Sequence, residues 1–137
     1  MKLFLLLSVF FLPLSLLGAA PVDEKGFEKS MKELGEIARR SRATQENKDA
    51  AQMEKDAAAL VRIYESTLSF WKERKAEDAI KWTEESSAAA KKVHAAMKAG
   101  NWEDVRANFQ GVMKNCKSCH EVHREKLDDG SYRLKVK

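Results

Sequence analysis

The chain carries four segments, all after residue 21, in which apolar side chains recur at helical spacing. In the first, residues 23–42, the apolar stripe consists of Phe27, Met31, Leu34 and Ala38. Intervals of four, three and four residues put these side chains on one face of a helix. The segment therefore predicts an amphipathic helix that turns this face to the core.

Two longer segments follow with the same periodicity. Residues 48–74 form the most regular pattern in the sequence, with inward positions at Met53, Ala57, Leu60, Val61, Tyr64, Leu68 and Trp71. Residues 77–99 have theirs at Ala79, Ile80, Thr83, Ala90, Val93 and Met97. Gly100 comes next, and because glycine is typical of the position just after a helix, we expect the third helix to end there.

The fourth helix is expected to start after Asn101 and to continue to about Leu127. Asn101 is a favourable N-cap residue. The apolar positions that follow it are Val105, Phe109, Val112 and Met113. Asp128, Asp129 and Gly130 favour a stop, so we expect residues 131–137 to be a loosely ordered C-terminal tail.

Together the four segments predict an all-α fold. No segment alternates with a period of two, and the two prolines, Pro13 and Pro21, precede every predicted helix. Short connections between helices of similar length favour antiparallel neighbours. We therefore expect one domain, residues 21–130, folded as an antiparallel four-helix bundle with up-down-up-down topology.

Residues 1–20 have the order of features found in a secretory signal peptide. Lys2 precedes an apolar run, residues 3–17, and the small residues Gly18, Ala19 and Ala20 follow. We expect cleavage after Ala20, export to the periplasm and no stable membrane insertion of the mature chain. An uncleaved anchoring helix is the alternative, although the run is close to the lower limit of about 17 residues for crossing a bilayer.

The charge pattern argues against a nucleic-acid-binding protein. Removing residues 1–20 takes away only Lys2 among the charged residues, so the mature chain keeps 24 basic and 21 acidic side chains, a formal charge of +3. These side chains are interspersed along every segment, whereas nucleic-acid-binding modules usually carry a clustered basic stripe. We expect no nucleic-acid partner, and the small excess is compatible with a weak attraction to acidic proteins.

The stretch NCKSCHEVHRE, residues 115–125, holds both cysteines of the chain and two of its three histidines. At about 100° per residue, Cys119 lies about 60° to one side of Cys116 on a helix, and His120 about 40° to the other. The three side chains therefore share one sector of the fourth helix and can bind one flat group together. A disulfide between the two cysteines would close a very short loop and stabilise the fold little.

Cys-x-x-Cys-His is the signature of covalent haem c attachment, in which the two thiols add to porphyrin vinyl groups and the histidine binds the iron. The sequence therefore predicts one haem c held by Cys116, Cys119 and His120. Three other interpretations stay open: a zinc site with His123 as fourth ligand, a thioredoxin-like redox pair, which needs a βαβ setting, and a plain disulfide.

With this motif on the last helix of a four-helix bundle, the chain resembles the cytochrome c′ family, the class II c-type cytochromes. The resemblance covers residues 21–137 and is strongest over residues 88–125, AAAKKVHAAMKAGNWEDVRANFQGVMKNCKSCHEVHRE, which look like the family's third-helix end, turn and haem helix. The family commonly has an aromatic and then a basic residue at the third and fourth positions after the haem histidine. Here these are His123 and Arg124. The resemblance implies that Arg124 pairs with a haem propionate, and we expect His123 to lie partly exposed beside the haem edge.

The first helix resembles the low-spin branch of the family. KSMKELGE, residues 29–36, contains the pattern Met-Lys-x-x-Gly, which implies that Met31 is the second axial ligand of the iron. Phe27 departs from the family, which often has a basic residue there. The residues themselves exclude Met113, which shares a helix face with His120. They leave open Met53, Met97, an open sixth site, and a Met31 that only fills the core.

The resemblance implies an exported mono-haem cytochrome that carries single electrons between redox partner proteins and is not an enzyme. The alternative is a five-coordinate cytochrome c′ that binds nitric oxide or carbon monoxide as a sensor or scavenger. Many members of the family form dimers through their first two helices, so the resemblance also implies a homodimer. A helical interaction protein with a disulfide or a zinc ion is the third interpretation.

Overall fold

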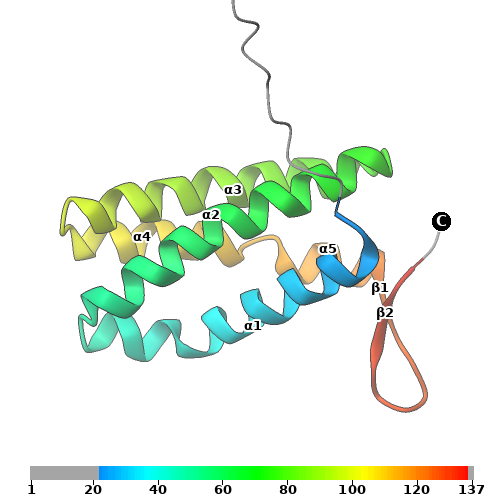
Figure 1. Ribbon diagram of the computed structural model, residues 1–137, viewed down its shortest axis with the longest axis horizontal. Helices are drawn as coiled ribbons and strands as arrows, with labels where there is room; N and C mark the ends of the chain where they lie inside the picture. The colour runs from blue at the N-terminus through cyan, green and yellow to red at the C-terminus, as the bar shows by residue number, and fades with distance from the viewer. Residues whose placement is uncertain (1–21, 136–137) are drawn as a thin grey trace, which may run out of the picture.

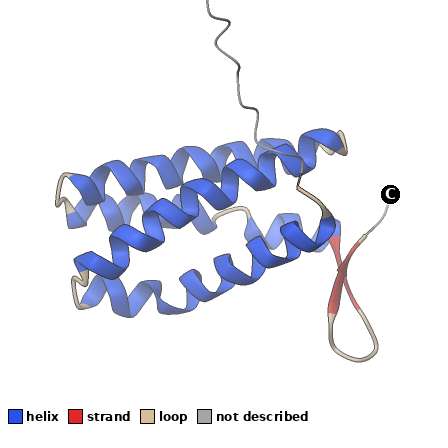
Figure 2. Ribbon diagram, in the orientation of Figure 1, coloured by secondary structure: helices blue, strands red, loops and turns tan. Residues whose placement is uncertain are grey.

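The computed structural model describes residues 22–135, which form a bundle of helices with a two-stranded sheet at one end (Figure 1). The helices are α1 (Glu24–Glu46), α2 (Ala50–Glu73), α3 (Glu77–Lys98), α4 (Trp102–Met113) and α5 (Cys116–His123), and the strands are β1 (Arg124–Lys126) and β2 (Tyr132–Leu134). The predicted all-α class is confirmed, because the strands make up only a small part of the chain (Figure 2). The predicted signal peptide, residues 1–20, lies outside the described residues.

The helices begin and end at local signals in the sequence. At the start of α1, α2 and α4, a side-chain oxygen accepts a bond of 2.8–3.1 Å from the backbone amide three residues later; these N-caps are Asp23, Asp49 and Asn101. The bonds satisfy amides that lack a partner in the first turn of a helix. Gly100 has φ of 68°, a value that glycine adopts without strain, and the predicted end of the third helix is confirmed.

Helix α1 continues to Glu46, beyond the predicted end at residue 42. The additional turn is polar in sequence, yet Thr44 is buried and its hydroxyl donates to the Arg40 carbonyl at 3.1 Å. Arg42 and Glu46 pair across one turn at 2.8 Å. The apolar stripe stops before this turn, so periodicity alone could not reveal it.

The core lies between the helices, and one side of the bundle is less closed than the others. Its largest fully buried apolar side chains are Phe70, Ile37, Met53, Leu60, Ile63, Val93, Val105 and Val112. A separate aromatic cluster forms where Phe27 stacks on Phe70 at 4.2 Å and both meet Trp71 edge-on. Helix α2 packs along α3, and α3 along α4, whereas α1 and α4 touch at few points. The seam between α1 and the α4–α5 segment is therefore the weakly packed one.

The last part of the chain differs from the prediction. The expected helix to Leu127 is wrong: α4 ends at Met113, α5 starts at Cys116 and ends at His123, and an antiparallel hairpin follows. In that hairpin Arg124 is paired with Leu134, and Lys126 with Tyr132. Strand β2 therefore lies within residues 131–137, where we expected a loosely ordered tail. Strands of three residues are too short to show a period of two, which is why the pattern did not reveal them.

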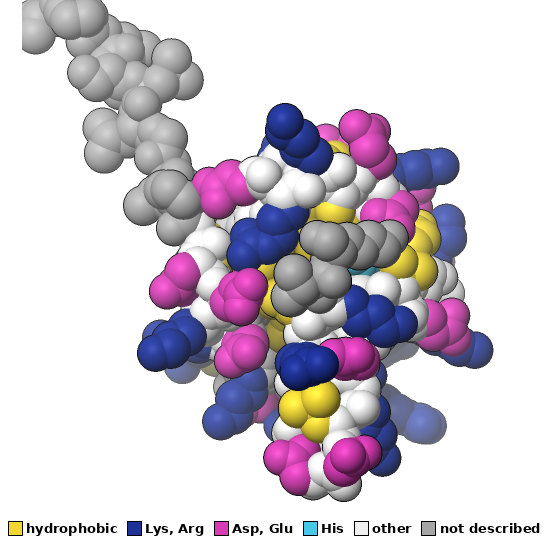
Figure 3. Space-filling view, turned by 90° about the vertical axis from the view of Figure 1, so that its right-hand side faces the viewer, with side chains coloured by type: hydrophobic (Ala, Val, Ile, Leu, Met, Phe, Trp, Pro, Cys, Tyr) yellow, Lys and Arg dark blue, Asp and Glu magenta, His cyan; other side chains and the backbone are white. Residues whose placement is uncertain are grey.

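The surface at the hairpin end carries both signs of charge. Figure 3 shows basic and acidic side chains intermixed over this face. None of the helices within residues 22–135 has the length and apolar character needed to cross a membrane.

Candidate functional site

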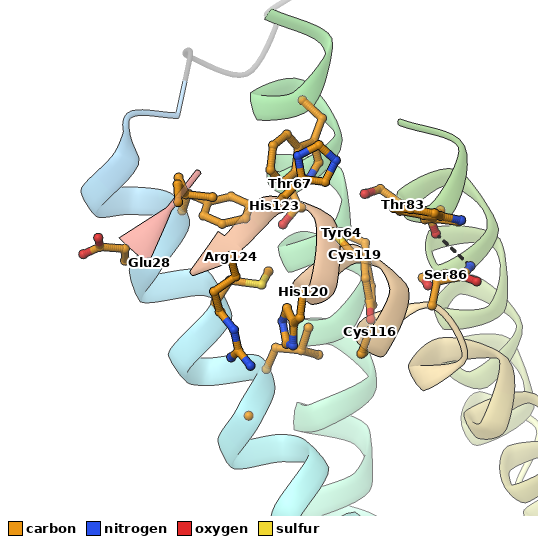
Figure 4. Close-up of a pocket in the computed structure, with 18 of the residues that line it drawn as sticks. Glu28, Tyr64, Thr67, Thr83, Ser86, Cys116, Cys119, His120, His123 and Arg124 are labelled. Atoms are coloured by element: carbon orange, nitrogen blue, oxygen red, sulfur yellow. Dashed lines mark hydrogen bonds between the residues drawn. The ribbon is translucent and has the colours of Figure 1, made fainter. Parts of the chain in front are cut away.

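A cavity of about 720 Å³ lies along the weakly packed seam (Figure 4). All five helices and the hairpin contribute to its lining, which is mainly apolar; the larger apolar side chains are Phe27, Met31, Leu34, Tyr64, Trp71, Trp82, Met113 and Leu134. Its volume is within the range of roughly 300–1,000 Å³ that is typical of small-molecule and cofactor sites. The cavity is therefore the candidate site for a ligand of cofactor size.

The three residues of the predicted haem motif line this cavity together. Cys116, Cys119 and His120 lie on α5 beside one another, and each is partly buried (Figure 4). No disulfide joins the two cysteines. Cys119 packs against the aromatic cluster, and Cys116 Sγ lies 4.0 Å from Met113 Sδ. The predicted sharing of one helix sector is thus present in the structure.

The surroundings of these side chains favour their uncharged forms. Burial raises the pKa of the Cys116 thiol, an effect that the Tyr64 hydroxyl partly offsets. Burial, with smaller contributions from Cys116 and Asp78, raises the pKa of Cys119 to about 11. Burial and then the charge of Arg124 lower the pKa of His120. At neutral pH the site therefore presents two thiols and a neutral imidazole, whose ring nitrogen can bind a metal.

The methionines differ in their relation to the cavity. Met31 lines it from α1, and Met113 lines it from α4, next to Cys116. Met53 and Met97 are buried in the main core and do not contribute to the cavity wall. Met31 is therefore the methionine that lines the cavity from α1, across the seam from the motif, whereas Met113 lies on the same side as Cys116.

Charged side chains of the cavity wall are mostly basic. Lys32, Arg124 and Arg133 contribute to the lining, with Glu28 as their acidic counterpart. The Arg124 guanidinium lies 3.9 Å from the centre of the Tyr132 ring, a cation–π contact between the two strands of the hairpin. Arg133 pairs with Glu125 across the same hairpin. An apolar cavity with excess positive charge on its wall suits an apolar ligand that bears carboxylates.

His123 is more buried than the sequence suggested. It lines the cavity, but it is 5% exposed, so the expectation that it is partly exposed is wrong. Its Nε2 lies 3.0 Å from Asp78 Oδ1, and its ring centre is 4.7 Å from that of Trp71. These partners come from α3 and α2, and nothing in the sequence around residue 123 could have identified them.

Trp71 carries the one orphaned polar atom in the described part of the chain. Its Nε1 is buried and has no hydrogen-bond partner, and the residue contributes to the cavity wall. A buried N–H group without a partner costs free energy. An acceptor on a bound group is one way to satisfy it.

Two further residues at the site were not singled out by the sequence. Tyr64 was predicted only as a core residue, yet its hydroxyl donates to the Val112 carbonyl at 2.7 Å. Asn115 joins α4 to α5, and its side-chain amide donates to α3. Their partners are distant in the sequence, so only the fold brings them together.

Within residues 22–135 there is no group of three or more histidine, cysteine or acidic side chains placed to hold a metal ion. That observation concerns a bare ion held by protein ligands. Haem iron instead has four nitrogens from its porphyrin and takes one or two axial ligands from the protein.

Comparisons of the chain with protein-family models, with curated proteins and with solved structures found no match. The functional assignment therefore depends on the motif, the cavity and the chemistry of the side chains that line it.

Proposed function

We propose that the chain is an exported mono-haem c-type cytochrome of the cytochrome c′ type, which carries single electrons between redox partner proteins. Its helices follow up-down-up-down topology, and the haem lies in the cavity along the α1 seam, next to the C-terminal helix. The observation that carries the proposal is that Cys116, Cys119, His120 and Met31 all line one largely apolar cavity of about 720 Å³.

The residues of the cavity fit a haem in three respects. The apolar wall suits the porphyrin ring, and the basic side chains suit its two propionates. Arg124 and Lys32 are the basic residues of the wall for which no acidic partner at salt-bridge distance is found within residues 22–135. The buried Nε1 of Trp71 adds a donor without a partner.

Each motif residue has a defined task in this proposal. The thiols of Cys116 and Cys119 would hold the haem by addition to its two vinyl C=C bonds, in which sulfur would bond to one carbon, the thiol hydrogen would go to the other, and no group would leave. His120 is neutral because burial lowers its pKa, so its ring nitrogen has a lone pair for the iron. When bound, the haem supplies the one-electron chemistry through that iron.

Met31, which lines the cavity from α1, would supply the second protein ligand to the iron. A methionine thioether favours the ferrous state and raises the reduction potential. Because His120 and Met31 come from helices at opposite ends of the sequence, ligation by both would also tie α1 to α5 across the weakly packed seam.

Absorption spectra of air-oxidised and dithionite-reduced protein test this function, on material exported by a host that attaches haem c. We expect a sharp reduced α-band and, in the oxidised protein, a weak sulfur-to-iron charge-transfer band. A broad high-spin spectrum would contradict electron transfer by a His/Met-ligated iron and favour a five-coordinate binder of nitric oxide or carbon monoxide. A protein without a Soret band would contradict both.

A further inference from the structure

The helix that carries the haem motif is interrupted just before its first cysteine. Helix α4 ends at Met113 and α5 begins at Cys116, and between them Asn115 has φ of −97° and ψ of 0°. This ψ is about 40° from the value of an α-helix. The first turn of α5 is closed by the Cys119 amide, which donates to the Asn115 carbonyl at 3.0 Å. The interruption therefore divides this part of the chain into two helices, with α5 carrying the motif.

Tyr64 supplies a hydrogen bond to the broken end of α4. In an uninterrupted helix the Val112 carbonyl would accept from the amide of Cys116, four residues later. Here it accepts from the buried Tyr64 hydroxyl of α2 at 2.7 Å. Burial raises the pKa of Tyr64, so the hydroxyl keeps its proton and remains a donor. The Tyr64 hydroxyl thus takes the place of the Cys116 amide as the donor to the Val112 carbonyl.

Asn115 stabilises the same break between α4 and α5 through contacts with α3. Its side-chain Nδ2 donates to the Trp82 carbonyl at 3.3 Å and to Glu85 Oε2 at 2.9 Å, both on α3. Gly111, in the last turns of α4, allows close packing, since a Cβ there would lie 3.0 Å from Ala89 Cβ of α3. The end of α4 is thus fixed to α2 and α3 while the cavity opens toward α1.

We propose that Tyr64 is a positioning residue for haem attachment, which holds the break between α4 and α5 so that Cys116 and Cys119 both face the cavity. The inference rests on the proposed function, because it concerns the attachment of the same haem. Tyr64 also lines the cavity, and its hydroxyl affects the pKa of Cys116; its positioning role acts through the bond to the Val112 carbonyl and so through α5. Without its hydroxyl, the Val112 carbonyl is free to bond the Cys116 amide, which continues α4 as a straight helix and turns the cysteines relative to the cavity.

The substitution Tyr64→Phe tests this role, since it removes the donor and keeps the buried ring. A neutral hydrogen bond of ordinary strength changes such an equilibrium roughly fivefold. We expect a share of the exported Tyr64→Phe chains to carry haem through one thioether only. That product has one titratable thiol per chain after denaturation, and its reduced pyridine haemochrome has an α-band at longer wavelength, because one vinyl group remains.

The matched control is Thr44→Val. Thr44 is also buried and also donates to a helical carbonyl, that of Arg40 at 3.1 Å, but it does not line the cavity. A free thiol in Tyr64→Phe and none in Thr44→Val would support the inference, whatever the two variants do to stability. Two thioethers in Tyr64→Phe, as in the wild type, would overturn it and leave the proposed function intact. Two free thiols in the wild type would overturn the proposed function and this inference with it.

Discussion

Burial sets the protonation states of the motif side chains that line the cavity. Burial keeps Cys116 and Cys119 protonated and His120 neutral. These are the forms that thiol addition to a vinyl group and metal binding use. Met31 is partly buried and contacts both the main core and the aromatic cluster, so this side chain lies where the two packed regions meet at the cavity.

The substitution Met31→Leu tests the proposed role of Met31 as a ligand of the iron. Leucine nearly preserves the side-chain volume and removes the sulfur, so the change in packing, apart from the loss of the iron bond, should cost less than about 1.5 kcal/mol. We expect the iron to change from low spin to high spin and the ferrous protein to bind carbon monoxide, as measured by absorption spectroscopy. Met53→Leu is the control, because Met53 is fully buried away from the cavity. A low-spin spectrum that persists in Met31→Leu would show that the ligand lies elsewhere.

For individual residues, the sequence predicts which side chains share a helix face better than it predicts how deeply each one is buried. The spacing of Cys116, Cys119 and His120 predicted that they share a helix sector, and they line one cavity. The same reasoning was wrong about the exposure of His123, which is buried beside Trp71 and Asp78. Spacing along one helix determines which side chains are neighbours on it, whereas burial depends on the other helices that pack there.

The position of α1 depends on a polar contact as well as on its apolar stripe. Asp56 of α2 is 2% exposed and accepts four hydrogen bonds, three from Arg40 of α1 and one from Gln52. The Asp56 contact raises the pKa of Arg40, so the guanidinium stays charged. Helix α1 has few contacts with α4. The Arg40–Asp56 ion pair with α2 is therefore a main contact of the C-terminal half of α1.

The substitution Arg40→Leu should therefore destabilise the fold. It leaves the buried Asp56 carboxylate with Gln52 as its remaining side-chain donor. Breaking a buried ion pair costs about 3–5 kcal/mol, and we expect about 2–3 kcal/mol because Arg40 is 41% exposed and water screens the pair. Urea denaturation measures the loss.

Arg42→Leu provides the matched control, two residues along the same helix. Arg42 pairs with Glu46 at the surface, where both side chains are well exposed, and exposed pairs contribute little. An equal loss of stability in the two variants would contradict the role assigned to Asp56.

Element boundaries could be predicted where a local signal sets them. Asp23, Asp49, Asn101 and Gly100 act within one turn of the chain, and the helices begin or end at these residues. The break before Cys116 has no such signal, because it is held by Tyr64 from α2 and by Asn115 contacts with α3. The hairpin escaped prediction because its strands are three residues long.

For the whole molecule, helical periodicity predicted the all-α class, and the three motif residues line the candidate cavity. Neither the periodicity nor the motif predicted a cavity, since its volume results from how far α1 lies from α4 and α5. That separation is a property of packing between distant segments. A haem in the cavity would supply the contacts that α1 lacks, so the protein should fold most stably in its haem-bound form.

The most direct test is the intact mass of the exported, purified protein under denaturing conditions, together with a titration of its thiols. We predict the mass of residues 21–137 plus one haem, and no free thiol, because both cysteines are bonded to the porphyrin. A mass equal to that of the bare polypeptide, with both thiols free, would contradict the account.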